Sequence, residues 1–174
     1  MLKETAPAVS RVGVLWAADD EGSAIAYKQY ETAARALNLT LQSLELRGPK
    51  ADWDYAFKIA AQARVNALIA IRSGLVNREQ KRIADFSIEK RLPSIFDGND
   101  FVEAGGLMSY NTDDVESFKR AAVYMDKILK GAKPADLPVE QPSKFELVIN
   151  LKTAKQIGLT IPPNVLVRVD RVIR

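Results

Sequence analysis

The sequence predicts an α/β protein: a flavodoxin-like three-layer sandwich with a five-stranded parallel sheet and a C-terminal strand-helix extension. Short apolar runs alternate along the chain with helical patterns of about ten to twenty residues. That spacing is typical of right-handed βαβ crossovers, which place the strands in parallel and cover both faces of the sheet. From residue 133 onward the pattern changes to proline-punctuated extended segments, one apolar run and a short helix.

Five apolar runs are the expected strands. The first, "RVGVLW", is short and valine-rich, as in a buried strand. The second alternates imperfectly between leucine and polar residues, which suits an edge strand. Pro93 opens the fourth, where a missing N–H donor is tolerated. The runs cover residues 11–16, 39–48, 66–71, 93–97 and 105–110.

Four helices are expected between and after these strands. Each begins at a residue whose side chain can cap free backbone N–H groups, and Gly131 follows the last helix as its C′ residue. The helices cover residues 19–39, 51–65, 77–92 and 111–131. The expected caps are Ser23, Asp52, Asn77 and either Thr112 or Asp113.

Composition excludes several classes of function. The 174 residues include no cysteine and no histidine, which removes disulfides, thiolate chemistry, most zinc sites and the commonest general base. The net charge of +3 is spread among acids, so we expect no nucleic-acid partner. No apolar run approaches the roughly 18 residues of a membrane span, and none resembles a signal peptide, so we expect a chain that does not span a membrane and that would remain cytoplasmic as written.

Ligands of open parallel sheets bind beyond the carboxyl ends of the strands, near helix N-termini. This rule selects four loops, at residues 17–23, 72–77, 97–101 and 110–113. In the first loop, Asp19 is a candidate for binding a cation. Ser23 is a candidate for holding a ligand carboxylate, or it only caps its helix.

The next two loops supply charged candidates. Arg72 and Ser73 are candidate ligand-binding residues. Arg72 leaves a buried strand directly into a Ser-Gly turn, where its guanidinium can reach a carboxylate or form a surface ion pair. Asp97 can accept an ammonium group or serve in an Asx turn. Gly98 allows the backbone to turn or to approach a ligand closely.

Tyr110 and Asn111 end the fifth strand, where a ring and an amide either line a cleft or pack in the core. The sequence contains no GxGxxG, GxxxxGK[ST] or GxSxG motif, so it lacks a recognisable phosphate loop and hydrolase elbow. We expect no enzyme activity, no cofactor and no metal. Binding of a small molecule is favoured over catalysis.

Four stretches carry a family resemblance: "RVGVLW", "FVEAGGLMSY", "YMDKILKGAKPADLPVEQPSKFELVINLKTAKQIGLTIPPNVL" and "DRVI". Together they resemble the substrate-binding proteins of ABC transporters, in the group associated with tryptophan and tyrosine uptake. Such periplasmic type I binding proteins have two α/β lobes that close on a ligand. The resemblance implies that this chain is the second lobe with its C-terminal return segment.

The resemblance implies a division of the chain. Residues 1–10 are a lead-in, residues 11–132 are the α/β ligand-binding lobe, and residues 133–174 are a hinge crossover followed by a strand and helix that return to a first lobe. Without that lobe we expect this last segment to fold back on its own lobe or to exchange between two chains in a homodimer.

The implied function is capture of a small solute such as an amino acid, aromatic ones included, for a permease, with the family located in the periplasm. The carboxylate would face Ser23 or Arg72, and the ammonium would face Asp97. The alternative is a truncated interaction or oligomerisation module that binds no ligand and catalyses no reaction.

Overall fold

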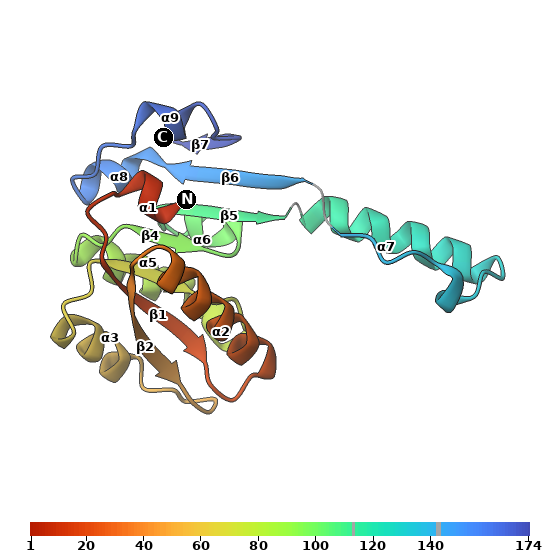
Figure 1. Ribbon diagram of the computed structural model, residues 1–174, viewed down its shortest axis with the longest axis horizontal. Coiled ribbons are helices and arrows are strands. Elements are labelled where there is room, and N and C mark those ends of the chain that lie inside the picture. Colours follow the sequence, from red (N-terminus) through yellow and green to blue (C-terminus); the bar gives the residue numbers. More distant parts are fainter. Residues whose placement is uncertain (113, 142–143) are drawn as a thin grey trace.

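The computed structural model describes residues 1–112, 114–141 and 144–174. Seven strands in these residues form one sheet in the order β2-β1-β3-β4-β5-β6-β7 (Figure 1). The first five run parallel, β6 is antiparallel to β5, and β7 is parallel to β6. Their bounds are β1 Arg11–Ala17, β2 Thr40–Leu46, β3 Ala67–Ala70, β4 Ser94–Phe96, β5 Met108–Thr112, β6 Phe145–Asn150 and β7 Arg171–Ile173. The α/β class is confirmed, and two C-terminal strands enlarge the expected five-stranded parallel sheet.

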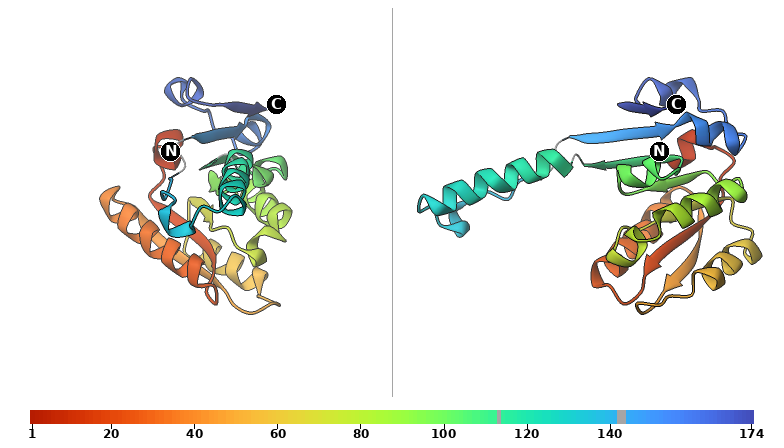
Figure 2. Two further views of the ribbon diagram at one scale, coloured as in Figure 1. Left: turned by 90° about the vertical axis from the view of Figure 1, so that its right-hand side faces the viewer. Right: turned by 180° about the vertical axis from the view of Figure 1, so that it is seen from behind.

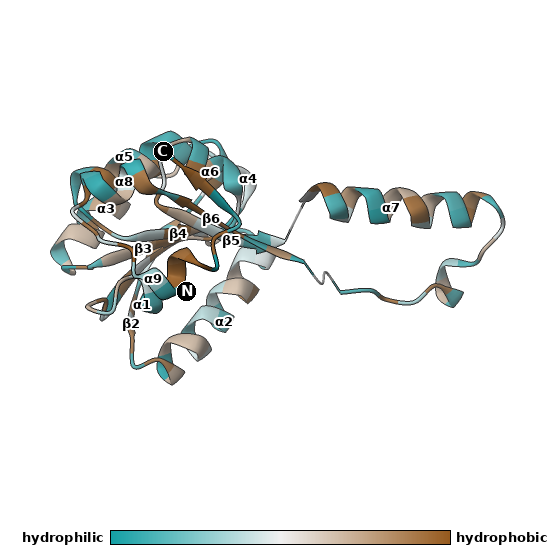
Figure 3. Ribbon diagram, turned by 90° about the horizontal axis from the view of Figure 1, so that it is seen from above, coloured by the Kyte–Doolittle hydropathy of each residue, from teal (hydrophilic) through white to brown (hydrophobic). Residues whose placement is uncertain are grey.

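Helices cover both faces of the sheet (Figure 3). One face carries α3, α5 and α6, and the other carries α2 together with the short α1 and α9. Apolar side chains of the sheet form a separate core with each layer. The bounds are α1 Leu2–Thr5, α2 Glu21–Ala36, α3 Trp53–Gln62, α4 Gly74–Asn77, α5 Gln80–Glu89, α6 Asn99–Glu103, α7 Asp114–Leu129, α8 Leu151–Gln156 and α9 Pro163–Leu166. The expected three-layer sandwich is therefore confirmed.

Strand β1 lies inside the sheet and is almost continuously apolar, because side chains on both of its faces are covered. Val12 and Val14 pack with the α2 layer, whereas Leu15 packs with the α3 layer. Between them, Gly13 allows β2 to approach: a Cβ at this position would lie 2.9 Å from Leu44 Cδ1. A larger residue at position 13 would have to displace that leucine.

The first two long helices begin at aspartates. Asp20 caps α2 by accepting a hydrogen bond from the Ser23 backbone N–H at 2.6 Å. Ser23 was expected as this cap and instead lies in the first turn of the helix, so that prediction was wrong. Asp52 caps α3 as expected, with its carboxylate accepting from Tyr55 N at 2.8 Å.

The third expected helix is divided in two. Ser73 caps the short α4 by accepting from Val76 N at 3.2 Å, and α5 begins only at Gln80. Asn77, the expected cap, is the last residue of α4, so that prediction was also wrong. The sequence pattern did not distinguish one helix from two because a helical turn at Ser73 precedes the amphipathic stretch directly.

The C-terminal segment completes the core. Leu147 and Ile149 of β6 are buried beside β5, and Val165 of α9 is fully buried in the same cluster as Leu2 of α1. The segment was expected to fold back on its own lobe or to exchange between two chains, and here it folds back on its own sheet. Residues 1–112 and 144–174 therefore make one body.

The helix α7 and the chain that follows it project from this body (Figures 1 and 2). We call residues 114–141 the arm. It contains α7, the short 3-10 helix η1 (Pro134–Asp136) and an extended return segment beside α7. Asp113, one of the two expected caps of α7, lies outside the described residues. The expected domain boundary at residue 132 falls within the arm, and the division into three segments stays a prediction.

One side of α7 is held by the return segment. Tyr124 donates a hydrogen bond to the Pro138 carbonyl at 2.6 Å, and Arg120 forms an ion pair with Glu140 at 2.5 Å. The remaining surface of the helix exposes large apolar side chains: Val115, Phe118, Val123, Met125, Ile128 and Leu129. The arm is amphipathic, and its apolar side is open to solvent.

None of the helices in residues 1–112, 114–141 and 144–174 combines the length and apolar composition that a membrane span requires.

Candidate functional site

The carboxyl ends of β1, β3, β4 and β5 lie along one edge of the sheet, which we call the carboxyl edge. The chain leaves this edge from β5 into the arm and re-enters it through β6, which runs the opposite way (Figure 1). In parallel α/β sheets such an edge is the usual place for a ligand. Every loop selected from the sequence opens onto it.

Strand register aligns three side chains across the carboxyl edge. Near the carboxyl ends of β1, β3, β4 and β5, one row of paired residues crosses the sheet: Leu15, Ala70, Phe96 and Ser109. One position further along, Trp16, Asp97 and Tyr110 come level with one another. Because side chains alternate between faces, all three lie on the face that carries α2. Asp97 and Tyr110 of this row were predicted from the sequence as site residues, whereas Trp16 was not.

Aromatic side chains of α2 lie above the row. Tyr27 stacks on Trp16 with ring centroids 4.7 Å apart and planes 14° apart. Trp16 Nε1 also donates a hydrogen bond to Ser43 Oγ at 2.8 Å, which fixes the orientation of the indole. Burial raises the pKa of the Tyr30 hydroxyl, and the nearby Asp97 carboxylate raises it further. Asp97 therefore lies near the Tyr30 hydroxyl of α2.

A second ring pair lies where β5 and β6 approach the arm. Tyr110 and Phe145 stack with centroids 5.5 Å apart and an angle of 18° between planes. Tyr110 is 43% exposed and Phe145 is 48% exposed. The sequence predicted Tyr110 as a site residue but gave no reason to join it to Phe145, which is 35 positions away.

Arg72 and Gly98 meet on neighbouring strands. Gly98 has φ of +142°, which supports its predicted role as a turn that other residues disfavour. A Cβ on Gly98 would lie 3.8 Å from Arg72 Cζ, so the guanidinium extends along the carboxyl edge beside the β4 loop. The Arg72 guanidinium and the Asp97 carboxylate, which precedes Gly98, therefore lie at the ends of the neighbouring strands β3 and β4.

Two predicted polar residues are buried with an oxygen atom that has no hydrogen-bond partner in the described structure. Ser23 is 2% exposed and Asn111 is 7% exposed. The hydrogen bond from the Ser23 backbone N–H lowers the pKa of the Asp20 carboxyl, while the Ser23 hydroxyl itself makes no hydrogen bond of normal geometry in the described structure. The Asn111 amide donates to the Thr112 carbonyl at 2.9 Å, which leaves its Oδ1 to accept. Buried oxygens without partners are uncommon and mark places where a bound molecule can complete the bonding.

A polar chain on the opposite face ties β5, α6 and β6 together. The Ser109 hydroxyl donates to Asn99 Oδ1, and the Asn99 amide donates to Glu146 Oε2, both at 2.6 Å. The sequence did not predict these residues as a group because they come from three separate segments. Their contacts fix the strand ends that carry Tyr110 and Asn111.

The two remaining predicted residues serve local structure. Asp19 accepts a hydrogen bond from Gly48 N at 2.6 Å and forms an exposed ion pair with Arg47 at 3.5 Å. Ser73 caps α4. Asp19 and Ser73 line one groove of about 350 Å³ between the β1, β2 and β3 loops, together with Arg78 at the end of α4. No group of three or more acidic side chains in the described part of the chain could hold a metal ion.

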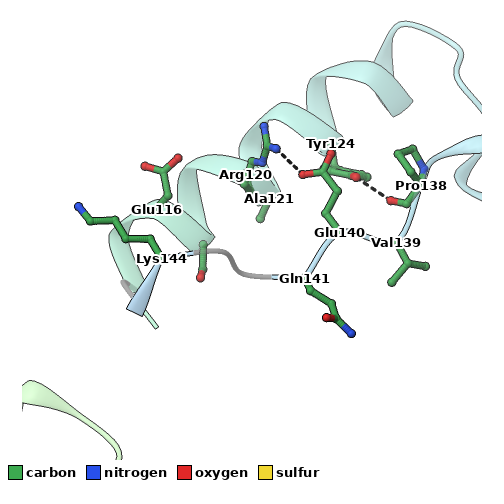
Figure 4. Close-up of a pocket in the computed structure, with 10 residues that line it drawn as sticks. Glu116, Arg120, Ala121, Tyr124, Pro138, Val139, Glu140, Gln141 and Lys144 are labelled. Atoms are coloured by element: carbon green, nitrogen blue, oxygen red, sulfur yellow. Dashed lines mark hydrogen bonds and ion pairs between the residues drawn. The ribbon is translucent and has the colours of Figure 1, made fainter. Parts of the chain in front are cut away.

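A larger cavity of about 560 Å³ lies on the arm, between α7 and the return segment (Figure 4). The Arg120–Glu140 ion pair and the Tyr124–Pro138 hydrogen bond cross it. Its walls are one helix and one extended segment with no sheet behind them, so it lacks the rigid support that positions ligand groups. We therefore place the candidate site at the carboxyl edge.

Sequence comparison identifies the family. Residues 1–173 match the family described as ABC transporter substrate binding protein. The chain belongs to this family. No curated protein sequence gives a significant match to this substrate-binding protein.

Solved structures of other proteins share its fold. A conserved domain protein from Vibrio cholerae O1 biovar El Tor has 23% sequence identity and a TM-score of 0.90, over 98% of this chain and 57% of that one. The ABC domain from Streptococcus pneumoniae in complex with L-Trp has 25% identity and a TM-score of 0.89, over 99% and 58%. CD0873, a ligand-free, open substrate-binding protein from Clostridium difficile, has 18% identity and a TM-score of 0.75, over 99% and 57%. This substrate-binding protein chain therefore spans less than two thirds of the length of these relatives.

Proposed function

We propose that this chain forms one wall of the ligand cleft of an ABC transporter solute-binding protein, with the ligand held at the carboxyl edge. The observation that carries the proposal is the row of Trp16, Asp97 and Tyr110, which brings two aromatic rings and one carboxylate level at the end of a rigid sheet. Solute binding, and no chemical conversion, is the role that the family supports.

The arm supports a cleft with a second wall. Relatives extend well beyond the matched region, and α7 presents apolar side chains that the body leaves uncovered. We infer that a second body packs on this side of α7. It would face the carboxyl edge near the point where β5 ends and β6 begins. Closure of the two bodies around a hinge at these strands would enclose the ligand.

An amino acid is the ligand class we propose. The relative from Streptococcus pneumoniae was solved with L-Trp, and the carboxyl edge offers both signs of charge. Asp19, Asp20 and Glu21 surround the start of α2, and Asp20 already occupies the free N–H of that helix end. Because these acids repel an anion, we favour Arg72 over Ser23 for the ligand carboxylate and Asp97 for the ammonium.

Delivery to a permease and a periplasmic location follow from the same proposal. A solute-binding protein must release its ligand to a membrane partner, and the body and arm contain no described helix that could itself cross a bilayer. Docking on an ABC permease is therefore part of the proposed function.

Calorimetry tests the proposal with tryptophan, tyrosine, phenylalanine, leucine and a sugar as the non-amino-acid control. We expect amino-acid binding that is weaker than micromolar, because one wall buries only part of a ligand. Sugar binding in place of amino-acid binding, or no binding by any compound at millimolar concentration, would refute the assignment. Micromolar or tighter binding would refute the half-cleft geometry.

A second function is favoured by one observation, the exposed apolar side of α7. An exposed helix of this kind can also associate with another protein without any ligand. Light scattering over a dilution series separates the two functions: self-association with no amino-acid binding would favour the interaction module.

A further inference from the structure

We propose that the stacked rings of Tyr110 and Phe145 form a platform at the carboxyl edge on which the planar side chain of an amino-acid ligand stacks. This inference rests on the proposed function and assigns the residue pair that selects the ligand side chain. Phe145 is the residue that this inference adds to the site, since no sequence pattern marks it as a binding residue.

The exposure of the pair distinguishes it from the core. Leu147 and Met108, its neighbours on the same face of β5 and β6, are buried at 2% and 0%. Tyr110 and Phe145 stay 43% and 48% exposed although the arm begins next to them. A stacked aromatic pair that neither the body nor the arm covers is available to a further ring.

The platform is rigid because it is built on paired strands. Tyr110 lies opposite Leu147, and Phe145 lies opposite Thr112 in the same antiparallel ladder, so the two rings are diagonal neighbours on one face. Behind this ladder, Glu146 accepts a hydrogen bond from the Asn99 amide at 2.6 Å. Rings fixed in this way lose little entropy when a ligand stacks on them.

The Asp97 carboxylate sets the direction in which an amino-acid ligand lies over the platform. Asp97 lies level with Tyr110 on the neighbouring strand, and neighbouring strands are about 4.8 Å apart. An ammonium group held at Asp97 thus leaves the side chain of the same amino acid over Tyr110, with Phe145 further out. A planar apolar side chain fits this arrangement better than a branched one because it can stack face to face on the open side of the ring pair.

The test compares three variants of the full 174-residue chain with the wild type, using L-tryptophan as the probe. Phe145→Leu removes the ring and keeps an apolar side chain, whereas Phe145→Tyr keeps the ring. Phe118→Leu removes an exposed ring on α7 and is the matched control. We expect Phe145→Leu to weaken L-tryptophan binding about three- to tenfold, and the other two variants to stay within about twofold of the wild type.

NMR supplies a readout that a purely structural role of Phe145 would not produce. In the wild type, nuclear Overhauser contacts should join the indole protons of bound L-tryptophan to the rings of Tyr110 and Phe145. Bound L-tryptophan without these contacts, or unchanged affinity in Phe145→Leu, would overturn the platform and leave the proposed function standing. Binding of L-leucine but not of L-tryptophan would likewise overturn the platform and leave the proposed function standing. Binding of no amino acid to the wild type would overturn the proposed function itself, and the platform with it.

Discussion

Individual polar residues at the carboxyl edge divide into those that stabilise the fold and those that have bonding capacity left. Asp20 is committed to α2, Ser73 to α4, and Asp19 to the β2–α3 loop. Asn111 retains a buried oxygen without a partner in the described structure. The sequence could predict that these residues lie at the edge, but the choice between cap and ligand contact depends on distances of a few tenths of an ångström.

The carboxyl of Asp20 should make the stability of the protein depend on pH. Hydrogen bonding from the Ser23 backbone N–H lowers the pKa of this carboxyl in the folded state. A lowered folded-state pKa gives stabilisation that is present above the unfolded-state pKa and is lost as the pH falls through the folded-state value. Asp20→Asn keeps an acceptor for the cap but cannot titrate, so urea denaturation at several pH values should show a smaller loss of stability in acid than the wild type. Parallel stability curves for the two proteins would contradict this role.

Gly106 should tolerate no side chain. A Cβ there would lie 2.8 Å from the Phe101 carbonyl oxygen and would overlap the Phe96 ring. We expect Gly106→Ala to lower the free energy of unfolding by about 1 to 3 kcal/mol through overpacking. Gly74→Ala, where a Cβ meets nothing within 4 Å, is the matched control and should leave the stability nearly unchanged.

At the scale of elements, β6 is buried in the sheet and α7 is exposed, which is the reverse of what the sequence suggested. The run "FELVIN" was expected to need a neighbouring body, and its residues from Leu147 onward are buried beside β5 instead, while Phe145 stays exposed. The helix expected to cover the sheet, α7, projects away from it. Hydrophobic periodicity gives the buried side of an element but not the partner that buries it, so this reversal could not be read from the sequence.

The same substitution in these two elements tests the reversal. Leu147 is 2% exposed in β6, whereas Leu129 is 83% exposed in α7. We expect Leu147→Ala to lower the free energy of unfolding by about 2 to 5 kcal/mol, since it leaves a cavity in the core. Leu129→Ala should change it by less than about 0.5 kcal/mol. Equal losses in chemical denaturation would mean that α7 packs on the body after all.

The central strands were the most predictable part of the fold. The runs at residues 11–16, 66–71 and 93–97 are β1, β3 and β4 within a few residues. The imperfect alternation at 39–48 correctly indicated an edge strand, since β2 is outermost. Strands β6 and β7 were harder to place because the arm separates them from the sheet in the sequence.

At the scale of the whole molecule, body and arm should differ in resistance to proteolysis. The arm has neither sheet pairing nor a core behind it, and exposed segments of this kind are cut first. We expect limited trypsin digestion to cut the lysine-rich part of the arm around residues 127–133 and to leave the two pieces of the body associated through β5 and β6. Mass spectrometry combined with size exclusion would detect this. Early cleavage within β6 would contradict the fold.

The position of the candidate site was easier to predict from the sequence than the residues that form it. The loop rule for parallel sheets located the carboxyl edge, and six of the eight predicted residues lie along it while Asp19 and Ser73 share the groove beside it. Trp16, Tyr27, Tyr30 and Phe145 were not predicted, because aromatic residues within strands and helices are normally core. The register of the sheet brings Trp16 level with Asp97 and places Phe145 beside Tyr110, while α2 stacks Tyr27 on Trp16 and brings Tyr30 near Asp97.

Amide NMR of the labelled chain, titrated with L-tryptophan, tests the central claim most directly. If the carboxyl edge is the ligand wall, the largest shifts should occur at Arg72, Asp97, Gly98, Tyr110 and Asn111. Amides lining the arm cavity, such as those of Arg120 and Tyr124, should hardly move. Shifts that cluster on the arm, or that leave the ends of β3, β4 and β5 unchanged at saturation, would contradict the account.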